Sequence, residues 1–312
     1  MDLRQLAALV AIAEHGGFSA AARALHTVQS NISTHVARLE RELGVVLVDR
    51  STGRLTAEGE TVVSRARRVQ AELDALTADV ASVNREVSGP ARIGIIGTTA
   101  RWLTSHLLSA ISDSYPLVRV VVVDATTTSL LPQLDSSRLD LAVIALPVHD
   151  SDIETEVLFE EELVLVAPPD HPLAERGRVH LRELASHEVL LEPPGTAFRD
   201  NLDTQAAALG VELRTKAEVD GMRLLASLAF SGFGAAVLPA SAAPGFYPGD
   251  FRRVAIDGVV GRVVGLARRR RGLPSAPARA VREVLFDVVA ELAPQQPGIH
   301  LPEGSSTIRA DA

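Results

Sequence analysis

A seam of apolar residues that alternates steps of four and three constrains this chain more than any other feature. Its members are Val62, Ala66, Val69, Leu73, Leu76, Val80, Val83 and Val87. This spacing has the 3.5-residue period of a coiled coil. We therefore expect a long linker helix over 59–89 that joins two chains, ended by Ser88-Gly89-Pro90. The alternative is a single amphipathic helix that packs on its own domain.

Three shorter helices are predicted before this seam. Asp2 and Gln5 have the spacing of a capping box that starts the first helix. Ser19 and Thr27 are predicted to cap a second, short helix and a third helix that ends near Leu43. Two helices separated by so tight a turn are typical of a helix-turn-helix unit.

One side of the third helix is predicted to be free. An apolar stripe from Ile32 to Leu43 must face the core, which leaves hydrogen-bonding groups and arginines outside. In the major groove of DNA, an amide side chain such as that of Gln29 can form two hydrogen bonds with adenine. A strand over Val45–Val48 and a turn over 50–54 then predict a wing that contacts phosphates. The candidate DNA-binding residues are Gln29, Ser30, Asn31, Ser33, Thr34, Arg38, Arg50 and Arg54. The alternative is the polar outer face of any three-helix unit.

Composition excludes several classes of protein. The 312 residues include no Cys, which excludes disulfide scaffolds, thiol nucleophiles, thiol redox switches and Cys-ligated zinc. The formal net charge is -8, yet residues 1–68 hold nine Arg against seven acidic residues. This asymmetry favours a polyanion partner for the N-terminal unit. No uncharged apolar stretch can span a bilayer, and the first residues do not resemble a secretory signal, so we expect a cytoplasmic protein without a membrane partner.

The remaining chain alternates short β-branched runs with helical segments, as βαβ units do. Strands are expected near 92–96, 118–123 and 141–144, with helices over 98–115 and 130–138 between them. A second set begins at Leu163. Because open α/β sheets bind ligands beyond the carboxyl ends of their strands, we expect a small-molecule site there.

The N-terminal residues resemble those of a known protein family. The N-terminal segment is similar, at matching spacing, to the signature of LysR-type transcriptional regulators. The matching residues are Ala21-Ala22, Leu25, Gln29, Ser33, Leu39-Glu40, Leu43-Gly44, Leu47, Arg50, Leu55-Thr56 and Gly59. The chain departs from the family at Val48, where Phe is usual, and at Thr34 and Ala37, where basic residues are common. The differences at Thr34 and Ala37 lower the charge of the third helix and leave its preferred bases open.

The resemblance implies a fold and a set of partners. The fold class is α/β with an N-terminal all-α winged helix-turn-helix over 1–58, the linker helix over 59–89, and a two-lobed, periplasmic-binding-protein-like effector domain over 90–293. Lobe I is expected over 90–162 and 268–293 and lobe II over 163–267. The tail over 294–312 is expected to be disordered because it is rich in Pro, Gly and Ser. The implied partners are double-stranded DNA with an interrupted palindromic operator, a second copy in a dimer and further copies in a tetramer, a small-molecule effector, and RNA polymerase.

The effector is expected between the lobes. Threonine hydroxyls and helix amides favour a carboxylate or another small anion. The candidate effector-binding residues are Thr98, Thr99, Thr127, Thr196, Phe198, Arg199 and Met222. The alternative for Thr98 is an ordinary N-cap, and Met222 fits a cleft wall.

Other signals predict no chemistry. His171, His180 and His187 lack metal-ligand spacing, the arginine run over 268–271 fits a solvated surface, and no catalytic constellation stands out. We expect no cofactor, no metal and no enzymatic activity. A solute-binding protein and an enzyme built on the same lobes remain the alternatives. Neither alternative accounts for the N-terminal unit.

Overall fold

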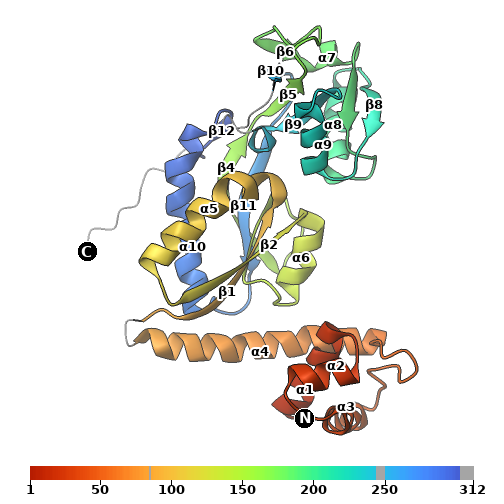
Figure 1. Cartoon of the computed structure of the whole chain (residues 1–312), viewed down its shortest axis with the longest axis vertical. Coiled ribbons are helices and arrows are strands. Elements are labelled where there is room, and N and C mark those ends of the chain that lie inside the picture. Colours follow the sequence, from red (N-terminus) through yellow and green to blue (C-terminus); the bar gives the residue numbers. More distant parts are fainter. Residues whose placement is uncertain (84–85, 244–249, 303–312) are drawn as a thin grey trace.

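The computed structural model describes residues 1–83, 86–243 and 250–302. An N-terminal module of three helices, a long helix α4 and two α/β lobes follow one another along the chain. Figure 1 shows α4 lying across the end of lobe I, with the N-terminal module at one end of α4. Along the parts of the chain that are described, none of the helices combines the length and apolar character that crossing a bilayer requires.

The N-terminal module forms around the apolar stripe of its third helix. Ile32, Val36 and Leu39 are fully buried against Leu9 and Ile12 of the first helix. The capping box is present, because the Asp2 carboxylate accepts a hydrogen bond from the Gln5 amide and the Gln5 side chain accepts one from the Asp2 amide, each at 2.9 Å. The helices are α1 (Leu3–His15), α2 (Phe18–Ala24) and α3 (Gln29–Leu43).

Ser19 and Thr27 do not cap helices. The N-caps of α2 and α3 are Gly17 and Val28, and neither makes a side-chain capping bond. The Ser19 hydroxyl instead donates to the Gln29 side chain, and the Thr27 hydroxyl accepts from the Asn31 amide. The Ser19–Gln29 bond therefore joins α2 to α3, and the Thr27–Asn31 bond joins the turn to α3.

The wing is smaller than predicted. One antiparallel bridge, Val48 to Leu55, replaces the four-residue strand expected over Val45–Val48. The Glu40 carboxylate accepts bonds from the amides of Leu47 and Val48 at 2.9 and 3.2 Å, so α3 holds the start of the wing in place of a partner strand. Gly59 is required by close approach, since a Cβ there would lie 2.1 Å from the Leu47 carbonyl oxygen.

The apolar seam of the long helix α4 (Ala57–Val83) is packed at its start and exposed along the rest of its length. The first two seam residues pack against the N-terminal module, with Val62 partly buried and Ala66 buried. The seam residues that follow, Val69, Leu73, Leu76 and Val80, are 40–62% exposed. The first turns of α4 thus pack on their own domain and the remaining seam faces outward, and its pairing with a second chain stays a prediction. Val87 lies beyond the end of α4.

Each lobe holds one six-stranded sheet. In lobe I the order is β12-β4-β11-β3-β1-β2, with β1 and β2 parallel from Gly89↔Val118 to Ile96↔Ala125. In lobe II the order is β6-β10-β5-β9-β7-β8. The lobe I strands are β1 (Gly89–Ile96), β2 (Val118–Ala125), β3 (Leu141–Leu146), β4 (Ile153–Glu161), β11 (Arg262–Arg269) and β12 (Ile299–His300). The lobe II strands are β5 (Leu163–Ala167), β6 (Arg178–His180), β7 (Glu188–Leu191), β8 (Arg214–Glu218), β9 (Ala235–Pro239) and β10 (Arg252–Asp257).

Helices cover both sheets. Those of lobe I are α5 (Gly97–Ser114), α6 (Thr127–Asp135) and α10 (Ala276–Leu292), and those of lobe II are α7 (Leu181–Leu184), α8 (Ala197–Ala208) and α9 (Met222–Phe230). Short 3₁₀ turns lie at η1 (Ala240–Ala242) and η2 (Ala293–Gln295). The lobe I core includes Trp102, Phe159 and Leu285, all buried.

Two boundaries differ from expectation. The chain leaves lobe I at Glu162 as predicted, but it returns over 258–261 and not near Arg268. The strand β11 pairs with β3 and β4, so residues 262–267 belong to lobe I. The tail is also ordered in part, because β12 pairs with β4 and buries Ile299. Residues 303–312 lie outside the described residues.

Candidate nucleic-acid interface and inter-lobe site

The outer face of α3 is exposed and polar. Gln29, Ser30, Asn31, Thr34 and Arg38 are all exposed, while the opposite stripe is buried. Ser33 is partly buried at the edge of this face. The helix geometry thus places six of the eight predicted DNA-binding residues on one accessible surface.

Three of these side chains are held by local bonds. The Gln29 carbonyl oxygen accepts from Ser19 at 2.8 Å, which fixes the side chain and leaves its amide nitrogen without a partner among the described residues. The Asn31 amide donates to Thr27 at 3.0 Å, and the Thr34 hydroxyl donates to the Ser30 carbonyl at 2.8 Å. The face is therefore partly preorganised.

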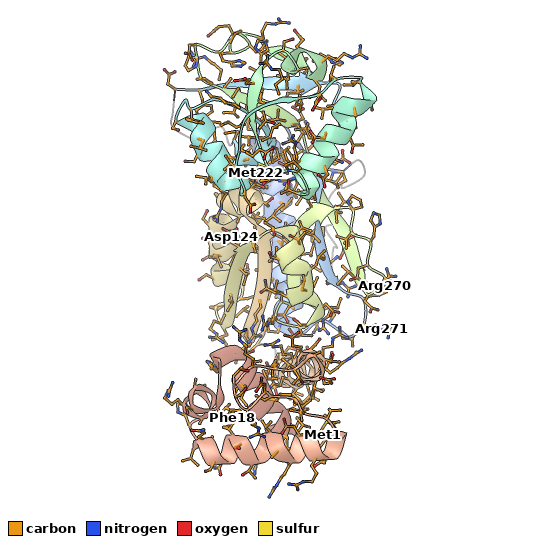
Figure 2. All side chains as sticks on the ribbon, turned by 90° about the vertical axis from the view of Figure 1, so that its right-hand side faces the viewer. Met1, Phe18, Asp124, Met222, Arg270 and Arg271 are labelled. Carbon is orange, nitrogen blue, oxygen red and sulfur yellow. The ribbon has the colours of Figure 1, made fainter. Side chains whose placement is uncertain are left out.

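Arg50 fastens the wing to α3. Its guanidinium donates to Ser33 at 3.0 Å and to Glu40 at 2.9 Å, and lies 5.0 Å from the centre of the Phe18 ring. Phe18 is marked in the N-terminal module in Figure 2. Burial alone would raise the pKa of Glu40, but bonds from the Leu47 amide, Arg50 and the Val48 amide together hold that pKa below its usual value. Glu40 is therefore an ionised structural group.

Arg54 differs from Arg50. It is exposed, and its guanidinium has no partner in the described part of the chain. The wing that carries it is tied to α3 through Arg50 and Glu40, so this exposed cation lies on a segment that is anchored to α3.

The start of α5 holds the first two effector candidates. Thr98 is buried, and its hydroxyl accepts from the Arg262 guanidinium at 2.7 Å. Arg262 also binds the fully buried Glu161 carboxylate at 2.8 Å, and the second oxygen of Glu161 accepts from the Ser241 amide at 2.8 Å. Thr99 is 0% exposed, and its hydroxyl has no partner among the residues described.

The remaining threonines make backbone bonds. Thr127 accepts from the Ala145 amide at 3.1 Å. Thr196 caps α8, accepting from the Arg199 amide at 3.3 Å and donating to the Pro193 carbonyl at 3.1 Å. Both hydroxyls thus already have structural roles.

The other three candidates lie in lobe II. The Arg199 guanidinium binds Asp203 at 2.7 Å and the Glu192 carbonyl at 2.9 Å, so its charge is used within its own lobe. Phe198 packs on the lobe II core, and Met222 packs at the start of α9. Burial raises the pKa of the neighbouring Glu192 carboxyl, with Asp220 raising it further and Thr196 and Arg262 opposing.

Four residues of the inter-lobe region were not predicted from the sequence to belong to it: Glu161, Arg262, Asp124 and Arg223. The last two form an ion pair between β2 of lobe I and α9 of lobe II. Partners in these two pairs are 101 and 99 residues apart in sequence. No local spacing relates such residues, so the sequence offers no signal for them.

The histidines and the arginine run were predicted to carry no chemistry. The His171 and His187 rings lie 5.2 Å apart, and His180 caps α7. Among the described ranges, no group of three or more suitable side chains gathers to hold a metal ion. Figure 2 places Arg270 and Arg271 at the end of lobe I nearest the N-terminal module.

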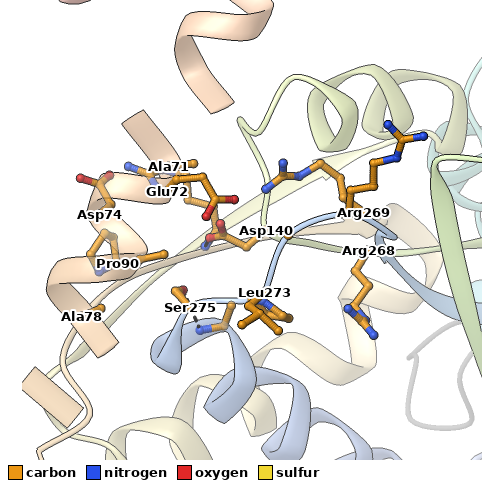
Figure 3. A pocket seen from close by; sticks show the side chains of 16 residues that line it. Ala71, Glu72, Asp74, Ala78, Pro90, Asp140, Arg268, Arg269, Leu273 and Ser275 are labelled. Carbon is orange, nitrogen blue, oxygen red and sulfur yellow. Dashed lines mark hydrogen bonds between the residues drawn. The ribbon is translucent and has the colours of Figure 1, made fainter. Parts of the chain in front are cut away.

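A small hollow lies where α4 meets lobe I. It has a volume of about 50 Å³ and contains none of the predicted effector residues. Figure 3 shows the Glu72 side chain of α4 beside Asp140 of lobe I, and Arg269 also lines the hollow. Burial raises the pKa of Asp140, whose carboxylate accepts from the Arg92 amide at 2.7 Å. The hollow therefore lies at the contact between α4 and lobe I.

Comparison with known proteins places both parts of the chain in one family. The model of the bacterial regulatory helix-turn-helix protein, lysR family, matches residues 3–60, and that of the LysR substrate binding domain matches residues 84–290. The DNA-binding transcriptional dual regulator OxyR of Escherichia coli K12 is 33% identical over 301 residues, covering 93% of this chain and 95% of the relative. A probable hydrogen peroxide-inducible genes activator of Mycobacterium leprae is 35% identical, covering 91% and 93%.

Solved structures agree. A cysteine-to-aspartate variant of full-length OxyR from Pseudomonas aeruginosa has a TM-score of 0.72 and 28% identity, covering 93% of this chain and 97% of that one. Full-length CbnR complexed with its target DNA has a TM-score of 0.67 and 25% identity, covering 93% and 99%. The chain belongs to the LysR family of DNA-binding transcription regulators, with an N-terminal helix-turn-helix and a two-lobed effector-binding domain.

Proposed function

We propose that the polar face of α3 reads base edges and that Arg54 contacts the phosphate backbone. The observation that carries this is the exposed set of Gln29, Ser30, Asn31, Thr34 and Arg38 on the side opposite the buried stripe. Gln29 has a fixed carbonyl and a free amide nitrogen, which suits bonding to a base. Arg50 and Ser33 bind one another and position the wing.

The protein acts as a dimer through α4. The exposed seam residues Val69, Leu73, Leu76 and Val80 supply the apolar face that a second α4 would cover. Two recognition helices related by a two-fold axis then read an interrupted palindrome. The family resemblance extends this assembly to a tetramer and to contact with RNA polymerase.

The effector is a small molecule with an anionic group, bound without covalent chemistry. Thr98, Thr99 and the first amides of α5 support an anion. Several relatives are named for hydrogen peroxide, but this chain has no Cys, so its response cannot use a thiol. A response to peroxide would need another group. We further propose that the protein acts in the cytoplasm and catalyses no reaction.

Fluorescence anisotropy tests this function. The full-length protein is titrated onto the DNA directly upstream of its own gene and onto random DNA of equal length, across a salt series. The proposal predicts tighter binding to the upstream DNA, with a salt slope that reports several phosphate contacts. No binding to either DNA at low salt would contradict it and favour a solute-binding protein. Equal binding to both would place the operator elsewhere.

A further inference from the structure

The ion pair between Asp124 and Arg223 is a direct link between the two lobes. Asp124 belongs to the end of β2, and Arg223 is the second residue of α9. Figure 2 shows Asp124 and Met222, the neighbour of Arg223, at the level where the lobes meet. The two side chains are 33% and 59% exposed, so solvent reaches both charges.

Gly97 shows how closely this pair approaches α5. A Cβ at Gly97 would lie 3.0 Å from a carboxylate oxygen of Asp124 and 3.1 Å from Cδ of Arg223. The backbone of Gly97 is not in the left-handed region, and a Cβ there would meet two flexible side chains at slightly less than ordinary van der Waals distance. The pair thus lies against the first residue of an 18-residue helix.

This position is suited to an anion. The first amides of a helix have no intrahelical acceptors, and the helix dipole favours negative charge there. Thr99, in the first turn of the same helix, is fully buried, and its hydroxyl has no partner among the described residues. The Asp124 carboxylate therefore occupies a place where a guanidinium and a helix N-terminus both stabilise negative charge.

We propose that Arg223 selects the effector by exchanging the Asp124 carboxylate for a carboxylate of the ligand. This rests on the proposed function, and it assigns Asp124 as an internal competitor for the same cation. Exposed ion pairs contribute little net stability, so a ligand held by further contacts can displace this one. Displacement frees β2 from α9 and changes how the lobes are held together. The guanidinium fork gives the ligand a bidentate partner.

The test uses the full-length protein and its single tryptophan. Trp102 lies on α5 one turn after Thr98, is buried, and packs edge-to-face on Phe159 at 5.5 Å. Its fluorescence is followed while sodium acetate replaces sodium chloride at constant ionic strength. The variants are Asp124→Asn, Arg223→Gln and Arg223→Lys. Arg178→Gln is the matched control, because Arg178 forms an exposed ion pair with Asp257 inside lobe II.

Substitution of Asp124 and substitution of Arg223 should change acetate binding in opposite directions. Asp124→Asn removes the competitor and should tighten acetate binding about two- to fivefold, the range that an exposed ion pair supports. Arg223→Gln removes the site and should weaken binding about tenfold or more, while Arg223→Lys keeps a cation and should recover part of that loss. A merely structural clamp would make Asp124→Asn and Arg223→Gln change binding in the same direction.

Gly97→Ala tests the same geometry without changing charge. The added methyl should separate Asp124 from Arg223 and alter the response to acetate. Gly177→Ala, where a Cβ would meet nothing within 4 Å, should not. No saturable response in Asp124→Asn, or equal changes in Asp124→Asn and Arg223→Gln, would overturn the proposal. Operator binding by the same preparations shows separately whether the regulator function stands.

Discussion

The two candidate sites of this molecule differ in whether their arginines are already paired. On α3 the side chains that face outward are exposed, and Arg38 and the nearby Arg54 have no side-chain partner among the described residues. Between the lobes the corresponding groups are occupied: Thr98 is bound by Arg262, and Arg223 by Asp124.

This difference indicates two modes of recognition. A long polyanion meets a surface whose arginines Arg38 and Arg54 are already available, so affinity depends on charge and salt. A small ligand must replace bonds that the protein already makes with itself, so affinity depends on which internal pairs can be exchanged. The helix α4 connects the two, since it packs on α1 at one end and bonds through Asp79 to the start of α10 at the other.

The largest expected effect comes from disrupting the seam of α4 that is proposed to pair with a second α4. Leu76→Asp places a charge in the exposed seam of α4, so the dimer should be lost and operator affinity should fall about 10²-fold as the two half-sites bind independently. The Trp102 response to acetate should not change. Thr77→Asp, one residue off the seam, is the control. A Leu76→Asp protein that sediments as a dimer would contradict the role of the seam.

The next effect tests base reading on the free face. Gln29→Ala should reduce the preference for operator over random DNA by about 1–3 kcal/mol, the value of a bidentate amide contact. Anisotropy titrations on both DNAs measure this. Equal losses on the two DNAs would show that Gln29 does not read bases.

Arg54→Ala should have a smaller and different effect. Removing one phosphate contact should weaken binding to every DNA alike and lower the salt slope by about one. The slope is obtained from titrations between 50 and 200 mM salt, roughly the range over which such contacts are resolved. An unchanged slope would remove Arg54 from the DNA interface.

The smallest effect is a contrast in pH dependence. The folded pKa of Glu40 is lowered, so its contribution to stability exists above its ordinary pKa of 4.5 and is lost as the pH falls through the folded value. The folded pKa of Glu192 is raised, so its contribution exists below 4.5 and is lost as the pH rises through the folded value.

Thermal unfolding between pH 4 and 7 measures this contrast. Glu40→Gln should lower the Tm more at pH 7 than at pH 4, whereas Glu192→Gln should raise it relative to wild type as the pH increases, each by about 2–4 °C. The same pH trend in both variants would show that the two sites do not differ as described.

Local chemistry made much of the fold predictable. The Asp2–Gln5 capping box, the end of α3 at Gly44 and the buried stripe Ile32, Val36 and Leu39 all depend on residues within one helix. In lobe I the strands expected near 92–96, 118–123 and 141–144 match β1, β2 and β3, whereas β4 was not predicted. The exposed face of α3 followed directly from the stripe.

Pairings between distant segments were not predictable. The run 263–267 has no charged residue and fits a strand of either lobe, and only its pairing with β3 and β4 places it in lobe I. Arg262 and Arg223 have no neighbours in sequence that identify their partners Glu161 and Asp124. The part of the tail that pairs as β12 looked disordered because its Pro and Gly content gave no sign of a strand.

The most direct test of the account is selection of bound sequences from random DNA by the full-length protein at fixed salt. The account predicts that enriched sequences share an inverted repeat, with half-site centres about 10 base pairs or a multiple of that apart. The repeat should disappear when Leu76→Asp is used instead. A library that stays random, or one that yields a single unpaired half-site for the wild-type chain, would contradict a dimer reading DNA through α3.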